Sequence, residues 1–156
     1  MSAQVTLRRA KAADAEAIWR MQREAFADLL AKYGDNETNP AAEPLHRTEE
    51  RLADPATHFY FIEAGERTVG AIRVIEAEEG GRKRISPLFV LPACRGKGYA
   101  RAAMIEAERI HGHGWALSTI AQEAGLCRLY EMLGYQRTGQ VQRISDCMTL
   151  VFYEKD

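Results

Sequence analysis

The sequence predicts a single α/β domain, residues 1–156, built on a sheet of mixed strand direction. The first observation is length, because 156 residues are the usual size of one domain and can bury a core of their own. The second is that segments with a helical spacing of apolar residues alternate with segments rich in aromatic and β-branched residues. The third is their order: strand, two helices, three strands, helix, strand, helix, two strands.

The first third of the chain carries one strand and two helices. Residues 4–10, QVTLRRA, have the composition of an opening strand. Asp14 is positioned to cap a helix that runs to about Lys32. A turn-rich stretch over residues 33–44 then precedes a shorter helix over residues 44–52, and such stretches inside a domain are often functional. The apolar residues at helical spacing in the first helix are Ile18, Met21, Ala25 and Leu29.

The remaining elements follow from changes in the apolar period. The turns GER and EEGGRK separate three strands, and a glycine-rich loop then leads into a helix that ends near Ile110. That helix has Ala100, Ala103, Ala107 and Ile110 on one face. The expected strands are residues 58–64, 68–77, 84–91, 115–120, 135–144 and 147–154, and the last expected helix is residues 123–133.

Composition and charge exclude several classes of protein. The chain is 46% hydrophobic and 28% charged, with a net charge of -1, so it lacks the positive excess of a nucleic-acid-binding protein. It contains no apolar run of the roughly 18 residues that a membrane span needs. The N-terminal residues lack the apolar stretch of a signal peptide. We therefore expect a cytoplasmic protein with neither a nucleic-acid nor a membrane partner.

The cysteines and histidines give no indication of a metal site. Cys94, Cys127 and Cys147 lie far apart, and no C-x-x-C or H-x-x-x-H pair occurs. His111 and His113 flank a glycine in HGHGW, which is typical of a plain loop between a helix and a strand. The sequence thus predicts no metal.

The stretch PACRGKGYARAAM, residues 92–104, predicts an anion site. A strand that ends in a glycine-rich turn and feeds a helix presents several unpaired backbone N–H groups at the positive end of the helix dipole. Gly96 and Gly98 let a bulky phosphate approach the backbone, while Arg95, Lys97 and Arg101 add positive charge. The expected ligand is a phosphate or pyrophosphate, although a capped helix with a solvated basic rim would have the same pattern.

Spacing separates this stretch from two familiar phosphate motifs. A P-loop needs Gly-Lys-Ser/Thr at its end, and the dinucleotide fingerprint needs a third glycine where Arg101 stands. The pattern Arg-x-x-Gly-x-Ala, formed by Arg95, Gly98 and Ala100 and preceded by Val-x-Pro, resembles the acyl-CoA-binding motif of the GNAT superfamily of N-acyltransferases. About thirty residues later, LYEMLGY resembles the family's second signature, and the predicted order of elements is that of the family.

The resemblance implies a fold, a cosubstrate and its contacts. The expected fold is a mostly antiparallel seven-stranded sheet with a splayed central strand pair and about four helices. The expected cosubstrate is acetyl-CoA, with its pantetheine arm on strand backbone and its pyrophosphate on the loop amides. Dimers are common in the family, so a homodimer is a further expectation. The implied cofactor residues are Phe89, Val90, Arg95, Gly96, Lys97, Gly98, Tyr99, Ala100 and Arg101.

Acetyl transfer to an amine needs a neutral nucleophile, a polarised carbonyl and a proton or hydrogen bond for the leaving thiolate. Tyr130 matches the family's tyrosine and can donate to sulfur, although a helix tyrosine can also simply pack on the core. Glu123 is the candidate base, and an acid in a first helical turn is also good capping chemistry. The strand RISPLFV carries no acid where some family members have glutamate.

The expected function is transfer of an acetyl group from acetyl-CoA to a primary amine of a small molecule or peptide, by direct attack in a ternary complex. The resemblance puts the amine between the first two helices and the last strands, where Asp35, Glu37 and Asp146 could attract a cation, although they could equally be solvated turn residues. The alternative is a non-catalytic module that senses acyl-CoA, which the missing strand glutamate favours.

Overall fold

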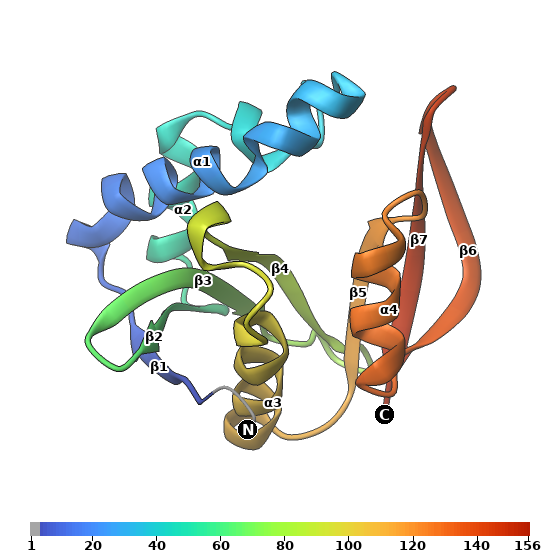
Figure 1. Cartoon of the computed structure of the whole chain (residues 1–156). Helices are drawn as coiled ribbons and strands as arrows, with labels where there is room; N and C mark the ends of the chain where they lie inside the picture. The colour runs from blue at the N-terminus through green and yellow to red at the C-terminus, as the bar shows by residue number, and fades with distance from the viewer. Residues whose placement is uncertain (1–3) are drawn as a thin grey trace.

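A computed structural model describes residues 4–156, so the first three residues of the predicted domain lie outside the described residues. The elements follow one another in the predicted order (Figure 1). None of the helices in this described part has both the length and the apolar composition needed to cross a lipid bilayer. The strands are β1 (Thr6–Arg9), β2 (Thr57–Ala64), β3 (Arg67–Ile75), β4 (Lys83–Val90), β5 (Trp115–Ile120), β6 (Gln136–Ser145) and β7 (Met148–Lys155); the α-helices are α1 (Ala15–Tyr33), α2 (Leu45–Ala53), α3 (Tyr99–His111) and α4 (Ala124–Met132); the short 3-10 helices are η1 (Ala12–Asp14), η2 (Pro40–Ala42) and η3 (Pro92–Cys94).

The strands form one seven-stranded sheet in the order β1-β2-β3-β4-β5-β7-β6. Neighbouring strands are antiparallel throughout, except that β4 and β5 are parallel. The hairpins β2–β3 and β6–β7 lie at the predicted turns, whereas the β4–β5 crossover passes through α3. The predicted fold class, an α/β domain with a mostly antiparallel sheet of seven strands and four helices, is confirmed.

The two halves of the sheet meet at a narrow junction between β4 and β5. Their register contains two residue pairs, Lys83 with Trp115 and Arg84 with Ala116. Beyond these pairs the strands diverge towards their C-terminal ends, as Figure 1 shows. Trp115 is fully buried at the junction, and its indole N–H donates to the carbonyl of Gly112 at 2.8 Å. The predicted splayed pair of central strands is therefore present.

The core is divided between the two faces of the sheet. Successive strand residues point to opposite faces, so Phe61 packs with α1 and α2 while Ile62 packs on the face that α3 covers. The α3 face carries the larger cluster, which continues through Leu117 and Tyr153 beneath α4. Packed side chains on the face covered by α3 and α4 therefore connect the two half-sheets where hydrogen bonds between β4 and β5 are absent.

Two local details differ from the sequence-based expectation. Ile110 is 43% exposed, because the helical period brings Met104 and His111 under the sheet in its place, beside Ala103 and Ala107. Asp14 does not cap α1 with its side chain, because its carboxylate accepts the backbone N–H of Lys11 at 2.8 Å. Neither change alters the order of elements.

Candidate functional site

The loop between β4 and α3 presents a row of unpaired backbone N–H groups. Gly96 and Gly98 have φ values of 77° and 82°, a region that residues with a side chain rarely adopt. The first hydrogen bond of α3 runs from the Ala102 N–H to the Gly98 carbonyl. The N–H groups of residues 96–101 precede that bond, and none of them donates to another backbone group of the described residues. They surround the positive end of the α3 dipole, which is the arrangement that binds anions.

A cavity of about 150 Å³ lies against this loop. The residues expected to contact the cofactor all line it, except Phe89 and Lys97. Two further residues line it: Cys94, which is buried in η3, and Leu129, which comes from α4. Leu129 is the first residue of the second sequence signature, LYEMLGY. That signature was therefore the feature of the sequence that could have placed α4 beside this cavity.

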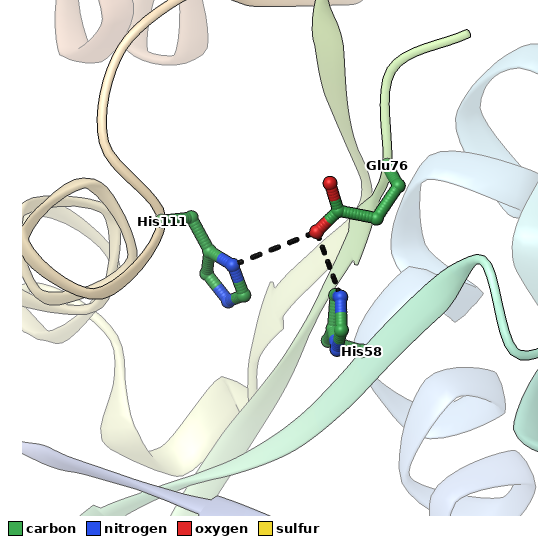
Figure 2. Close-up of side chains that lie close together, drawn as sticks. All are labelled: His58, Glu76 and His111. Atoms are coloured by element: carbon green, nitrogen blue, oxygen red, sulfur yellow. Dashed lines mark hydrogen bonds and ion pairs between the residues drawn. The ribbon is translucent and has the colours of Figure 1, made fainter.

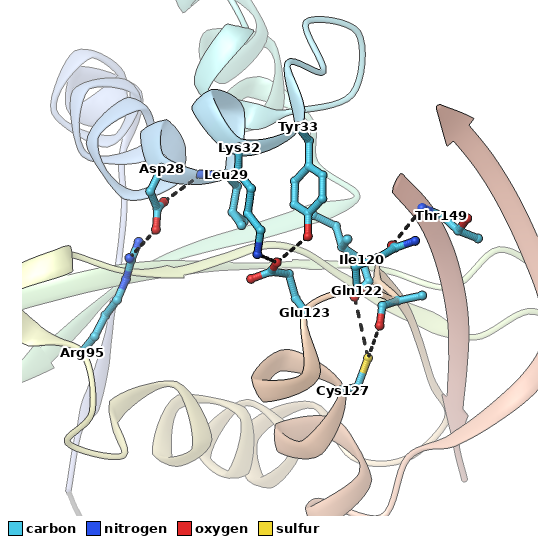
Figure 3. A network of polar contacts seen from close by, with 11 residues as sticks. Asp28, Leu29, Lys32, Tyr33, Arg95, Ile120, Gln122, Glu123, Cys127 and Thr149 are labelled. Carbon is cyan, nitrogen blue, oxygen red and sulfur yellow. Dashed lines mark hydrogen bonds and ion pairs between the residues drawn. The ribbon is translucent and has the colours of Figure 1, made fainter. Parts of the chain in front are cut away.

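Arg95 turns away from the loop towards α1. Its guanidinium donates to the carboxylate of Asp28 at 2.9 Å, as Figure 3 shows. It also donates to the carbonyl of Ala25. Its positive charge is therefore already paired. Lys97 and Arg101 are exposed, and neither forms an ion pair with any residue in the described range, which leaves their charges available to a ligand.

The last residues of β4 offer a backbone donor on the side where the sheet has opened. Leu91 donates its N–H to the carbonyl of Val69 on β3 at 2.8 Å. Because N–H directions alternate along a strand, the N–H of Val90 points away from β3, towards the space that β5 has left. The Phe89 ring packs on the other face of the sheet, edge-on to Phe26 at 5.8 Å between centroids. Only the backbone of Phe89 can therefore face the cavity side.

Gly70 on β3 fixes how closely β4 approaches at this point. A Cβ atom at Gly70 would lie 2.0 Å from the carbonyl oxygen of Phe89 and 3.0 Å from the Cα of Val90. No real contact is so short, so any side chain at this position would displace the end of β4.

Tyr130 lies on α4 within the larger core cluster and is 8% exposed. Its ring packs between Tyr135 and Tyr153, each with centroids 6.1 Å away. Its hydroxyl forms no hydrogen bond with the residues between 4 and 156. Burial raises the pKa of Tyr130 to about 12, with a smaller contribution from Cys127, so the phenol is protonated at neutral pH.

Glu123 immediately precedes α4 and joins it to the end of α1. One of its carboxylate oxygens accepts hydrogen bonds from Lys32 Nζ at 2.7 Å and from the Tyr33 hydroxyl at 2.5 Å, as Figure 3 shows. The carboxylate does not cap the helix. Because Arg95 ties the middle of α1 to the loop after β4, α1 spans the opening of the sheet and is fastened on both sides.

We call the contact of Glu123 with Lys32 and Tyr33 the Glu123 bridge. Each of its three groups shifts the pKa of the others. The hydrogen bonds from Lys32 and Tyr33 hold the pKa of Glu123 below its ordinary value. The hydrogen bond to Glu123 raises the pKa of Lys32. Burial, followed by the nearby carboxylate, raises the pKa of Tyr33. At neutral pH the bridge is therefore a charged carboxylate between an ammonium and a phenol.

Two of the three acids expected to attract an amine, Asp35 and Asp146, have local partners, and the third, Glu37, is exposed. Asp35 is buried and accepts the backbone N–H groups of Glu37 at 3.1 Å and Thr38 at 3.0 Å, which stabilises the turn after α1. Asp146 pairs with Arg143 across the β6–β7 turn. Glu123, predicted as the base, instead lies at the start of α4 facing the end of α1 (Figure 3).

The sequence comparison decides the family. A model of the GNAT acetyltransferase domain matches residues 23–156, which is most of the chain. The chain belongs to the GNAT acetyltransferase family. The family resemblance predicted from the two motifs is therefore confirmed, and with it membership of a family of acyltransferase enzymes that uses acetyl-CoA.

Relatives and solved structures agree with this assignment. N-acetyltransferase 8B of Rattus norvegicus is 32% identical over 101 residues, which are 60% of this chain but 46% of that protein. The chain therefore spans about half the length of this curated relative. The spermidine N-acetyltransferase of Vibrio cholerae in complex with CoA and spermine superposes with a TM-score of 0.75 at 19% identity, over 97% of this chain and 94% of that one. An acetyltransferase of Thermus thermophilus gives 0.71 at 16% identity, over 99% and 98%. These two structures support the GNAT fold.

Proposed function

We propose that the chain, as a single domain over residues 1–156, transfers an acetyl group from acetyl-CoA to a primary amine by direct attack in a ternary complex. The observation that carries the proposal is the cavity at the opening of the sheet, with the unpaired N–H groups of residues 96–101 on one side and the free N–H of Val90 nearby. Anion binding and carbonyl polarisation are thus available next to each other.

The cosubstrate would be held mainly by backbone. Its pyrophosphate would accept hydrogen bonds from the N–H groups of residues 96–101, with Lys97 and Arg101 as the flanking charges. The pantetheine arm would extend along the free edge of β4, and the thioester oxygen would accept the N–H of Val90. The nine cofactor residues expected from the motif keep that role in this proposal, Phe89 through its backbone alone and Arg95 as part of the cavity wall, because its charge is paired with Asp28.

In the reaction, the cationic amine first loses one proton to solvent to become a neutral nucleophile. Its nitrogen then attacks the thioester carbon, the C–S bond breaks and the nitrogen gives up a second proton. Tyr130 would donate a hydrogen bond to the departing sulfur. Because its pKa of about 12 lies above the roughly 8.5 of a thiol, the phenol stabilises the thiolate rather than handing over its proton. The second proton released by the amine can then neutralise the sulfur.

Glu123 is the proposed contact for the acceptor amine. Lys32 already places a primary ammonium 2.7 Å from its carboxylate, so a substrate amine has the same chemistry as the group it would replace. The lowered pKa makes Glu123 a weak base but a good partner for a cation. Acting as the general base would require it to release Lys32 first.

The acceptor class that we propose is a cationic amine, either a small polyamine or a peptide amine. Two observations support this class: the contact of Glu123 with the Lys32 ammonium, and the likeness in fold to spermidine N-acetyltransferases.

We also propose a cytoplasmic location, with which three free cysteines are consistent, and a homodimer, which the family resemblance implies.

The test is release of free thiol from acetyl-CoA in the presence of spermidine, lysine peptides or peptides with a free N-terminus. We expect turnover above background hydrolysis with at least one class. Acetyl-CoA should also raise the melting temperature, which reports binding separately. A thermal shift without turnover for any amine would favour the alternative, a non-catalytic acyl-CoA sensor in which Glu123 is permanently engaged by Lys32.

Replacing Tyr130 by phenylalanine tests the leaving-group step. We expect Tyr130→Phe to lower kcat at least about tenfold, since it removes a hydrogen bond to a developing charge, with little change in acetyl-CoA affinity. Tyr153→Phe is the matched control, because the Tyr153 hydroxyl bonds to Glu131 at 2.6 Å and so serves structure. Equal rates for Tyr130→Phe and the unmodified protein would remove Tyr130 from the mechanism.

A further inference from the structure

Three side chains that the sequence did not connect converge at the far end of α3 from the glycine loop. His58 lies on β2, Glu76 follows the last residue of β3, and His111 is the last residue of α3. Figure 2 shows the two imidazole rings facing one carboxylate. One ligand atom from each residue lies within 4.8 Å of the others.

The separations suit a small divalent cation. His58 Nε2 lies 2.8 Å from Glu76 Oε1, and His111 Nδ1 lies 3.8 Å from the same oxygen. In a tetrahedral zinc site with bonds of about 2.0–2.2 Å, ligand atoms are about 3.3 Å apart. These two distances lie on either side of that value, and no ligand atom is more than 4.8 Å from another, so small side-chain rotations would close the site around an ion.

The backbone that carries these residues is held firmly. His58 pairs with Val74 in the β2–β3 ladder, and Glu76 donates its N–H to the carbonyl of Ala56 at 2.7 Å. The side chain of His111 is 10% exposed and that of His58 22%, so both rings are partly removed from water. A site on three packed elements needs little ordering when the ion arrives.

His111 is already oriented as a ligand. Its Nε2 lies 2.8 Å from the hydroxyl of Tyr60, and a proton on that nitrogen leaves the lone pair of Nδ1 facing Glu76. A bound histidine commonly donates its second ring N–H to such a partner. The carbonyl groups at the C-terminal end of α3 add negative potential beside the ring.

Arg9 is the contact that opposes an ion here. Its guanidinium lies 2.9 Å from His58 Nδ1 and donates to it, which leaves the proton of the neutral ring on Nε2. An ion on Nε2 requires that proton to move to Nδ1 and the Arg9 contact to break. Arg9 is exposed, and turning away would also cost its long contact with the Thr57 carbonyl at 3.4 Å and its stacking over the Tyr60 ring.

We propose that His58, Glu76 and His111 form a binding site for one divalent transition-metal ion of the zinc class, with water as the fourth ligand. The site lies outside the proposed acetyl-transfer chemistry and would fasten the end of the β2–β3 hairpin to the C-terminal end of α3. It goes beyond the proposed function and is independent of it.

Cobalt provides a direct test on metal-free protein, because tetrahedral Co²⁺ absorbs visible light. The exposed thiol of Cys147 is first removed with Cys147→Ser, so that it cannot bind the metal. We expect one Co²⁺ per chain with a tetrahedral spectrum that lacks thiolate charge transfer, and stoichiometric displacement by Zn²⁺. Zn²⁺ should also raise the melting temperature. Absence of saturable binding at micromolar metal would overturn the proposal.

Single substitutions then locate the ion. His58→Gln, Glu76→Gln and His111→Gln should each weaken Zn²⁺ binding at least about tenfold in calorimetric titrations. His113→Gln, in the loop just after α3, is the matched control and should bind as the parent does. Arg9→Met should bind more tightly, because it removes the competing donor and a nearby positive charge. Binding that ignores the first three substitutions, or is lost in the control, would assign the metal to another place.

Discussion

The glycine loop and the Glu123 bridge lie on opposite sides of the same opening, and they are built in different ways. The loop acts through backbone N–H groups, which two glycines at positive φ orient. The bridge acts through side chains of Lys32, Tyr33 and Glu123 that meet only in the folded chain. A site made of backbone N–H groups tolerates changes of side chain, but it does not tolerate a change in the course of the backbone. A site made of charged side chains depends on the charges themselves.

The largest effect is expected where the backbone path itself is displaced. Gly70→Ala puts a Cβ atom 2.0 Å from the Phe89 carbonyl oxygen, so the end of β4 must move. We expect the free energy of unfolding to fall by about 1–3 kcal/mol and acetyl transfer to fall with it, since the Val90 N–H is displaced. Chemical denaturation and thiol-release kinetics measure the two effects.

Gly125→Ala is the control for added volume. A Cβ atom at Gly125 meets nothing within 4 Å, and its φ is not positive, so alanine in α4 should leave stability unchanged or raise it by up to about 1 kcal/mol. Equal stability of Gly70→Ala and Gly125→Ala would mean that β4 does not depend on the close approach at Gly70.

A smaller effect is expected in the loop itself. Gly98→Ala forces a side chain into a φ of 82°, so the N–H groups at the start of α3 lose their orientation. We expect acetyl-CoA affinity to fall about tenfold, with about 1–2 kcal/mol of strain lowering stability. Calorimetric titration with acetyl-CoA measures the affinity.

Gly65→Ala carries similar strain away from the site. Gly65 has a φ of 63° in the β2–β3 turn, and a Cβ atom there meets nothing within 4 Å. It should lose stability without losing acetyl-CoA affinity. If both alanine variants bind acetyl-CoA as the unmodified protein does, the amides of residues 96–101 are not the pyrophosphate site.

The side-chain region should respond to charge alone. Glu123→Gln keeps the shape and removes the charge, so we expect KM for a cationic amine to rise about fivefold while acetyl-CoA affinity is kept. Glu16→Gln, which breaks an exposed pair with Arg20, is the control and should change neither. A fall in kcat of about a hundredfold at constant KM would instead make Glu123 the general base, and unchanged kinetics would remove it from the acceptor site.

The same bridge should give a small pH dependence of stability. Lys32 and Tyr33 lower the pKa of Glu123 from its ordinary 4.5, so its charged form is favoured by folding. This contribution is complete above pH 4.5 and is lost as the pH falls through the lowered pKa. The difference in melting temperature between the unmodified protein and Glu123→Gln should therefore be present at pH 7 and vanish in acid. A difference that persists in acid would have another origin.

The contrast also explains what could be predicted. The glycine loop, the strands and the helices depend on neighbours in sequence, so their positions followed from spacing and period. Lys32 and Glu123 are 91 positions apart, and nothing in either segment indicates the other. His58, Glu76 and His111 likewise match no metal-binding spacing, because three separate elements bring them together. The helical period could not show that His111, rather than Ile110, turns its side chain towards the sheet, because adjacent positions fit the same period.

The two-pair junction at Lys83 and Arg84 has a consequence for how such an enzyme can diversify. Since hydrogen bonds join the half-sheets at one end alone, the angle between them depends on the side chains packed beneath, among them Trp115 and Leu117, and on the contacts that α1 makes across the opening. Changes of side-chain size in that layer would widen or narrow the opening while the glycine loop stays intact. Trp115 and Leu117 can therefore alter the cavity at the opening although neither lines it.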